Sequence, residues 1–121
     1  MNRVFVIQER PERNIISAQQ FGQLTPIISS RKQVVLSAGP TISIMKKVLK
    51  DFCDDDYLLL MGDPAAIGIA CSIASDMNRG RYKLLKWDKQ EMMYYPIQID
   101  LYQKGELDDG DNIYRSNSER D

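Results

Sequence analysis

Apolar positions in the first two thirds of the chain fall into short continuous runs separated by polar turns. Val4–Ile7 and Tyr57–Met61 are such runs, and unbroken apolar character is typical of strands that are covered on both faces. Val34–Leu36 forms a third run. Leu24–Ile28 is also strand-like, but it contains Pro26, which favours an edge position because proline has no N–H to donate. These four segments predict the strands of a small sheet.

Two longer segments carry apolar residues at helical spacing. Residues 40–52 place lysines opposite their apolar positions, and residues 65–77 follow Asp63–Pro64, a favourable N-cap with proline in the first helical position. Small side chains dominate the second segment. We therefore expect it to press closely onto the sheet, and a bulky replacement of Gly68 to harm folding. A further single helical turn is expected at residues 17–21.

The last ordered unit is predicted to be an antiparallel hairpin of Arg81–Trp87 and Met92–Leu101. Its second strand alternates strictly between two sets of side chains, which is typical of a half-buried strand. Pro96 places that strand at an edge of the sheet. We expect Trp87 and Tyr95 to face the core.

Composition changes sharply near residue 104. Residues 105–121 hold six acidic side chains against two basic ones, which predicts a flexible acidic tail over residues 104–121. The alternating strands and helices before it predict a single α/β domain over residues 1–103. Its architecture is a small, mainly parallel sheet flanked by helices, with the antiparallel hairpin on the C-terminal side.

Charge and cysteine usage exclude several classes of protein. The net charge is −1, while residues 1–104 carry 14 basic and 11 acidic side chains, an excess too small for non-specific phosphate binding alone. Cys53 and Cys71 are expected to be reduced thiols on the inner faces of helices. Because the chain has no histidine, it lacks the usual zinc ligand set and cannot form a Ser–His–Asp triad. Asp54–Asp56 is interpreted as a solvated turn. No signal peptide or membrane span is present, so we expect a cytoplasmic protein without cofactor or metal.

The carboxyl ends of the parallel strands form the first candidate site, since ligands of open α/β sheets collect there. Helix N-termini at this edge favour anions, whereas Asp63 opposes a phosphate, and neither strand-to-helix loop is a GxGxxG or Walker motif. An anion-binding crevice and a plain set of turns and caps both fit this pattern. The candidate ligand-binding residues are Glu9, Arg10, Ser37, Gly39, Thr41, Gly62 and Asp63.

The hairpin supplies the second candidate surface. Its cations alternate with aromatic rings, a pattern that suits single-stranded nucleic acid. An ordinary hairpin, with aromatic rings toward the core and lysines toward water, fits the same pattern. The candidate residues for binding a macromolecule are Arg79, Arg81, Lys83, Lys86, Trp87 and Tyr94.

The strand that ends at Glu9 and the later turn Met61–Gly62–Asp63 resemble part of the Toprim arrangement of primases and topoisomerases. Members of that family hold magnesium with a Glu after the first strand and an Asp-x-Asp after a later one. Glu9 and Asp63 match this pattern, but Met61 stands where the first Asp would be, which weakens divalent-metal binding. The resemblance thus implies a degenerate metal site.

A second resemblance covers most of the chain. The segments that carry it are Asp51–Leu59, Gly62–Gly68, Gly80–Asp88 and Tyr94–Ile99. They are similar to segments of short uncharacterised accessory proteins of marine tailed bacteriophages. This resemblance implies an accessory protein that acts inside an infected bacterium, and it brings no activity with it.

Two functions therefore follow from the sequence. The first is a non-catalytic binding protein that engages a host or phage protein, or single-stranded nucleic acid, and does not bind membranes. The second is nucleotide or phosphate binding in the strand-end crevice. The first is favoured because the chain carries no complete catalytic set, and the sequence leaves the oligomeric state open.

Overall fold

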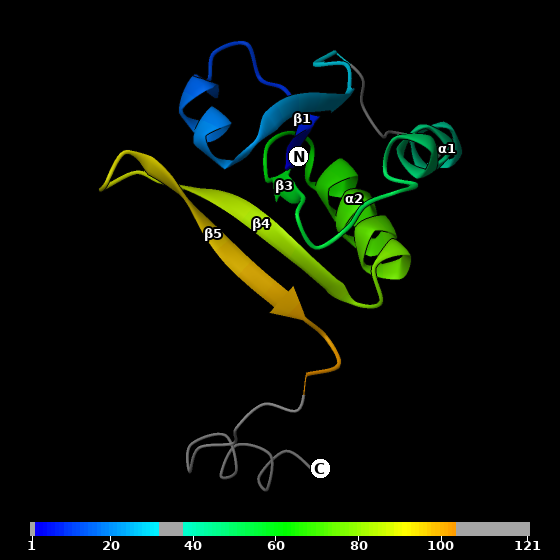
Figure 1. Cartoon of the computed structure of the whole chain (residues 1–121). Coiled ribbons are helices and arrows are strands. Elements are labelled where there is room, and N and C mark those ends of the chain that lie inside the picture. Colours follow the sequence, from blue (N-terminus) through cyan, green and yellow to red (C-terminus); the bar gives the residue numbers. More distant parts are fainter. Residues whose placement is uncertain (1, 32–37, 104–121) are drawn as a thin grey trace, which may run out of the picture.

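The computed structural model describes residues 2–31 and 38–103, which form one sheet with helices on both faces (Figure 1). The predicted strand Val34–Leu36 and the predicted tail 104–121 lie outside the described residues. The elements are β1 (Arg3–Gln8), the 3-10 helix η1 (Ile16–Phe21), β2 (Gln23–Ile28), α1 (Gly39–Val48), β3 (Tyr57–Leu59), α2 (Pro64–Met77), β4 (Arg81–Asp88) and β5 (Met93–Asp100).

The strand order is β2-β1-β3-β4-β5. The pairs β1–β2, β1–β3 and β3–β4 are parallel, and β4–β5 is antiparallel. The predicted mainly parallel sheet with a C-terminal hairpin is thus confirmed. Both proline-containing strands stand at the edges, β2 with Pro26 and β5 with Pro96, as the missing N–H donors predict.

The side chains of β1 explain its unbroken apolar pattern. Phe5 and Ile7 face the cluster beneath α1 and α2, whereas Val4 and Val6 face a second cluster beneath η1. Figure 1 shows α1 and α2 on one side of the sheet and η1 on the other. Both faces of the central strands are covered, so each successive residue must be apolar.

A buried amide joins the carboxyl ends of the strands to α2. Gln8 is fully buried; its Oε1 accepts a hydrogen bond from the Asp63 N–H at 2.8 Å, and its Nε2 donates to the Ser29 carbonyl at 2.8 Å. Gly62 passes over this side chain with φ +116°, where an added Cβ would lie 2.4 Å from Gln8 Cβ. Glycine is therefore required at this turn.

The start of α2 agrees with the sequence, but the position of Gly68 does not. Asp63 caps the helix by accepting from the Ala65 N–H at 3.0 Å, and Pro64 is the first helical residue, as predicted. The small residues Ala66, Ala70 and Ala74 face the core. Gly68 instead faces outward, where a Cβ added to it would have no neighbouring atom within 4 Å, so the expected close approach of Gly68 to the sheet is wrong.

The turn after α1 holds a buried carboxylate that the sequence did not indicate. Asp56 is 1% exposed and forms an ion pair with Arg3 at 2.7 Å, while its Oδ2 also accepts from the Cys53 N–H at 3.0 Å. The prediction of a solvated turn is therefore wrong for Asp56. Asp54 is exposed as expected and pairs with Arg81 at 3.1 Å.

The free edge of the sheet is interrupted at Pro96. The Leu101 N–H donates to the Gly80 carbonyl, so alternate positions, including Leu85–Pro96, are the non-hydrogen-bonded pairs of this hairpin. The nitrogen of Pro96 thus lies on the outer edge, where it offers no donor. This arrangement opposes the addition of another strand to β5.

Candidate functional site

A cavity of about 250 Å³ opens at the carboxyl end of the sheet, and we call it the rim crevice. Its walls come from the segment after β1, the end of β3, the first turns of α2 and the facing ends of β4 and β5. Its lining residues are Arg10, Glu12, Arg13, Leu60, Met61, Gly62, Ile67, Trp87 and Tyr94. An adjoining cavity of about 260 Å³ shares four of them and adds Asn14 and Met92.

An aromatic pair forms one wall of the rim crevice. Trp87 and Tyr94 are register partners across the hairpin, and their ring centroids lie 4.9 Å apart in an edge-on arrangement. This non-hydrogen-bonded position brings cross-strand side chains closest together. Tyr94 is 3% exposed, and burial raises the pKa of its phenol, although the nearby Arg13 charge acts in the opposite direction.

Two arginines, Arg10 and Arg13, also line the rim crevice. Arg10 is held in place through its backbone, because its N–H contacts the sulfur of Met61 at 3.4 Å. Neither Arg10 nor Arg13 forms an ion pair with any residue of 2–31 or 38–103. The crevice therefore combines an apolar wall with two cations that are available to a ligand carboxylate or phosphate.

The described residues of the predicted strand-end crevice lie in different surroundings. Arg10 and Gly62 line the rim crevice, and Asp63 caps α2. Glu9 and Gly39 are exposed, but they are not among the residues that line it, and Thr41 is only 2% exposed. Ser37 lies outside the described residues. No described cavity is lined by both strand-to-helix junctions, at residues 39–41 and 62–63, so the shared crevice stays a prediction.

The predicted hairpin surface is also divided. Trp87 and Tyr94 meet in the rim crevice, but Arg81 is paired with Asp54, and the Lys83 ammonium lies 4.1 Å from the centroid of the Tyr57 ring. Alternation along β4 sends Lys86 to the opposite face from Lys83. The expectation that Tyr95 rather than Tyr94 faces the core is wrong, since Tyr94 is the buried member.

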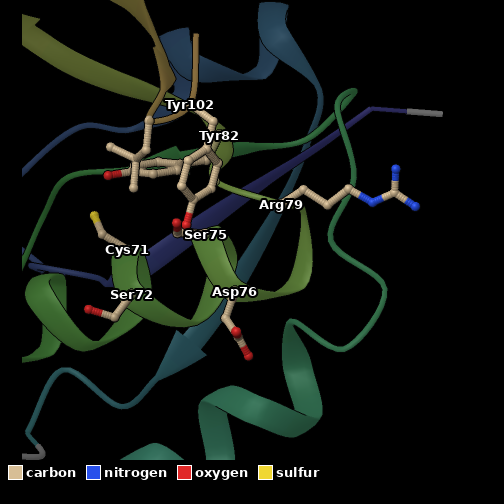
Figure 2. Close-up of a pocket in the computed structure, with 9 residues that line it drawn as sticks. Cys71, Ser72, Ser75, Asp76, Arg79, Tyr82 and Tyr102 are labelled. Carbon is tan, nitrogen blue, oxygen red and sulfur yellow. The ribbon is translucent and has the colours of Figure 1, made fainter.

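A second cavity, of about 450 Å³, lies at the other end of β4, and we call it the tyrosine pocket (Figure 2). The second half of α2 forms one side, and the turn into β4 and the end of β5 form the other. Its lining residues are Cys71, Ser72, Ser75, Asp76, Arg79, Gly80, Tyr82, Leu101 and Tyr102. Arg79 thus lies at the opposite end of β4 from the candidate residues Trp87 and Tyr94.

The two thiols occupy different environments. Cys53 is exposed and follows α1, so the expectation that it faces inward from a helix is wrong. Cys71 is half-buried on α2, and desolvation raises the pKa of its thiol. A thiol of this kind stays protonated near neutral pH and is a poor nucleophile.

The described residues contain no group of three or more Cys, His, Asp or Glu side chains that could hold a metal ion. None of the helices within 2–31 and 38–103 is both long and apolar enough to cross a bilayer.

Comparison with known families identifies the origin of the chain. The profile of the Phage Pam3 gp32-like protein family matches residues 2–101. The chain belongs to this family. The expectation of a phage protein is therefore confirmed. Neither a curated protein nor a solved structure matches the chain significantly.

In this Phage Pam3 gp32-like protein, sequence reasoning missed five residues that line the rim crevice, which are Glu12, Arg13, Leu60, Met61 and Ile67. Arg13 lies in an irregular segment whose course no local pattern specifies. Met61 was interpreted as the end of a buried strand and as the residue in place of the first Toprim Asp, but not as a site residue. Ile67 faces the crevice from α2. One sequence signal for this site was available. Arg10 and Arg13 lie three positions apart, just after the end of a predicted strand.

Proposed function

We propose that this phage protein is a non-catalytic accessory protein that binds another protein at the rim crevice. The observation that carries the proposal is the meeting of Arg10, Arg13, Trp87 and Tyr94 around a single cavity. Aromatic residues, methionine and arginine are enriched at protein interfaces, where a few of them supply most of the binding energy.

Exposed apolar side chains around the same end of the sheet support a protein partner. Met92, at the hairpin tip, is 69% exposed and lines the adjoining cavity. Met93 and Ile16 are exposed as well, and Ile16 opens η1, which contacts β5. Flexible methionine side chains adapt to the surface of a partner.

The chemistry of the crevice suggests what the partner presents. Its wall accepts an apolar side chain, and the two guanidinium groups at its border suit a neighbouring carboxylate. Glu12 lies between them in sequence and lines the same cavity, which opposes the dense negative charge of a nucleic acid backbone. Arg81 and Lys83 already have partners within the chain, so the hairpin offers few cations to such a backbone.

Other parts of the sequence prediction stay predictions. A marine tailed phage as the source, the host cytoplasm as the compartment, and the Toprim-like interpretation of Glu9 and Asp63 belong here. Nucleotide or phosphate binding is less favoured, because the Asp63 carboxylate occupies the first turn of α2.

Affinity capture tests the proposal. The tagged full chain is used to recover partners from phage-infected host cells, beside the variants Arg13→Glu and Arg31→Glu. Both arginines are exposed, but only Arg13 lines the crevice. We expect a nuclease-resistant protein partner that Arg13→Glu loses and Arg31→Glu retains. Retention by both variants, or a partner that disappears after nuclease treatment, would contradict the proposal.

A further inference from the structure

The tyrosine pocket lies at the opposite end of β4 from the rim crevice, and its geometry is set by Gly80. This residue has φ +80°, and an added Cβ would lie 2.6 Å from the Tyr102 ring. The ring of Tyr102 therefore packs directly on the glycine backbone. Tyr102 is still 77% exposed, so much of its surface is available to a ligand.

A second ring and two hydroxyl groups complete the lining. Figure 2 shows Tyr82 reaching from β4 toward Ser75 on α2, with Ser72 one turn earlier on the same helix. Burial, with a smaller contribution from Cys71, raises the pKa of the Tyr82 phenol. The ring of Tyr82 is thus neutral near pH 7, and the face of a phenol ring carries the negative lobe of its quadrupole.

The charges around the pocket also favour a cation. The negative end of the α2 dipole lies beside it, and the last turn of α2 contains no basic side chain. Asp76, in that turn, is exposed and makes no ion pair within the described ranges. The one cation of the lining is Arg79, and Figure 2 shows its guanidinium directed away from both tyrosine rings.

We propose that the tyrosine pocket binds an ammonium group over the rings of Tyr82 and Tyr102. Figure 2 shows the carboxylate of Asp76, which also lines the pocket, directed away from the rings, and we infer that this exposed side chain turns toward the bound cation. Cation–π contact and charge pairing are the interactions that such a lining offers. The cavity of about 450 Å³ has room for a lysine side chain or a short aliphatic amine. The ammonium comes either from a lysine of a protein or from a free polyamine. This inference is independent of the proposed function of the rim crevice.

The experiment is an NMR titration of the full chain with four probes. They are N-acetyl-lysine amide, its ε-trimethylated form, spermidine, and N-acetyl-lysine amide acetylated on the ε-nitrogen as the uncharged control. We expect saturable shifts at residues 71–82 and 99–103 with the three cationic probes and none with the uncharged one. Tighter binding of the lysine derivatives assigns the site to a protein lysine, and tighter binding of spermidine assigns it to a polyamine.

Three variants separate a binding role from a structural one. Asp76→Asn and Tyr102→Leu should each weaken binding about fivefold, as loss of one charge pair or one cation–π contact predicts. Arg79→Gln should strengthen it, since the substitution removes the only competing cation of the lining. Asp55→Asn, in an exposed turn elsewhere, is the matched control and should leave binding unchanged. Equal response to the uncharged probe, or insensitivity to both Asp76→Asn and Tyr102→Leu, would overturn the proposal.

Discussion

The side-chain oxygen of Gln8 accepts a hydrogen bond from the backbone N–H of Asp63 at 2.8 Å. The same amide donates to the carbonyl of Ser29 just after β2. One buried side chain thus fixes the ends of two strands relative to the start of α2. The floor of the rim crevice depends on this connection, because Gly62 lies against it.

Replacing Gln8 with leucine should destabilise the fold. The substitution keeps the size of the side chain but leaves the Asp63 N–H and the Ser29 carbonyl without this partner, at a cost of about 2–4 kcal/mol for two buried groups. Urea unfolding of the two proteins measures the loss. Gln19→Leu, at an exposed position, is the control and should change stability by less than about 0.5 kcal/mol. Similar stabilities for both variants would show that Gln8 is not needed.

Alanine substitutions at Gly62 and Gly68 should have opposite effects. At Gly62 the φ is +116°, and an added Cβ would lie 2.4 Å from Gln8 Cβ, so the position excludes a side chain. Gly62→Ala should therefore lower the free energy of unfolding by more than about 2 kcal/mol. Gly68 lies in α2 with open space around it, and Gly68→Ala should stabilise the helix by about 0.5–1 kcal/mol. Thermal unfolding of the wild type and of both variants measures the change in stability. A destabilising Gly68→Ala would indicate that this face of α2 is covered.

Arg3→Met should destabilise the protein near neutral pH by leaving the Asp56 carboxylate buried without its cation. Removing one partner of such a pair costs about 3 kcal/mol, somewhat less here because Arg3 keeps partial exposure. Chemical unfolding at pH 7 measures this loss.

The same variant should be less sensitive to acid. Arg3 holds the pKa of Asp51 below its ordinary 3.8, so this pair stabilises the folded state above pH 3.8, and its contribution disappears as the pH falls through the lowered value. The stability gap between wild type and Arg3→Met should therefore narrow under acid conditions. A gap that stays constant with pH would exclude this pairing as its source.

Iodoacetamide should label Cys53 before Cys71. Cys53 is exposed, whereas burial raises the pKa of Cys71 and lowers its thiolate fraction; we expect a rate difference of about tenfold or more. Mass spectrometry of peptides from a time course at mildly alkaline pH gives both rates. Faster labelling of Cys71 would indicate that α2 opens away from the sheet.

Local patterns predicted the elements and much of their arrangement. Proline predicted the edge positions of β2 and β5, because its missing N–H can be recognised from the residue type alone. Asp63 was identified as an N-cap because capping depends on residues only two positions apart. The unbroken apolar run of β1 similarly implied cover on both faces. In each case the decisive interaction lies within the element itself or follows from its period.

The candidate site was harder to predict because it depends on long-range register. Whether Tyr94 or Tyr95 faces the core is decided by the pairing Trp87–Tyr94, and an offset of one residue reverses the faces. The ion pair of Arg3 with Asp56 spans 53 positions. Arg13 enters the rim crevice from a segment without periodicity. No short-range pattern contains these contacts.

Trp87 and Tyr82 lie toward opposite ends of β4, so the two cavities that they line are set apart along the strand. Four residues of strand lie between Trp87 and Tyr82, and the five residue-to-residue steps span about 17 Å. No lining residue is common to the rim crevice and the tyrosine pocket. Occupying one end leaves the other accessible. Taken together, the two proposals describe a protein that would hold two different molecules at once, one at each end of the hairpin.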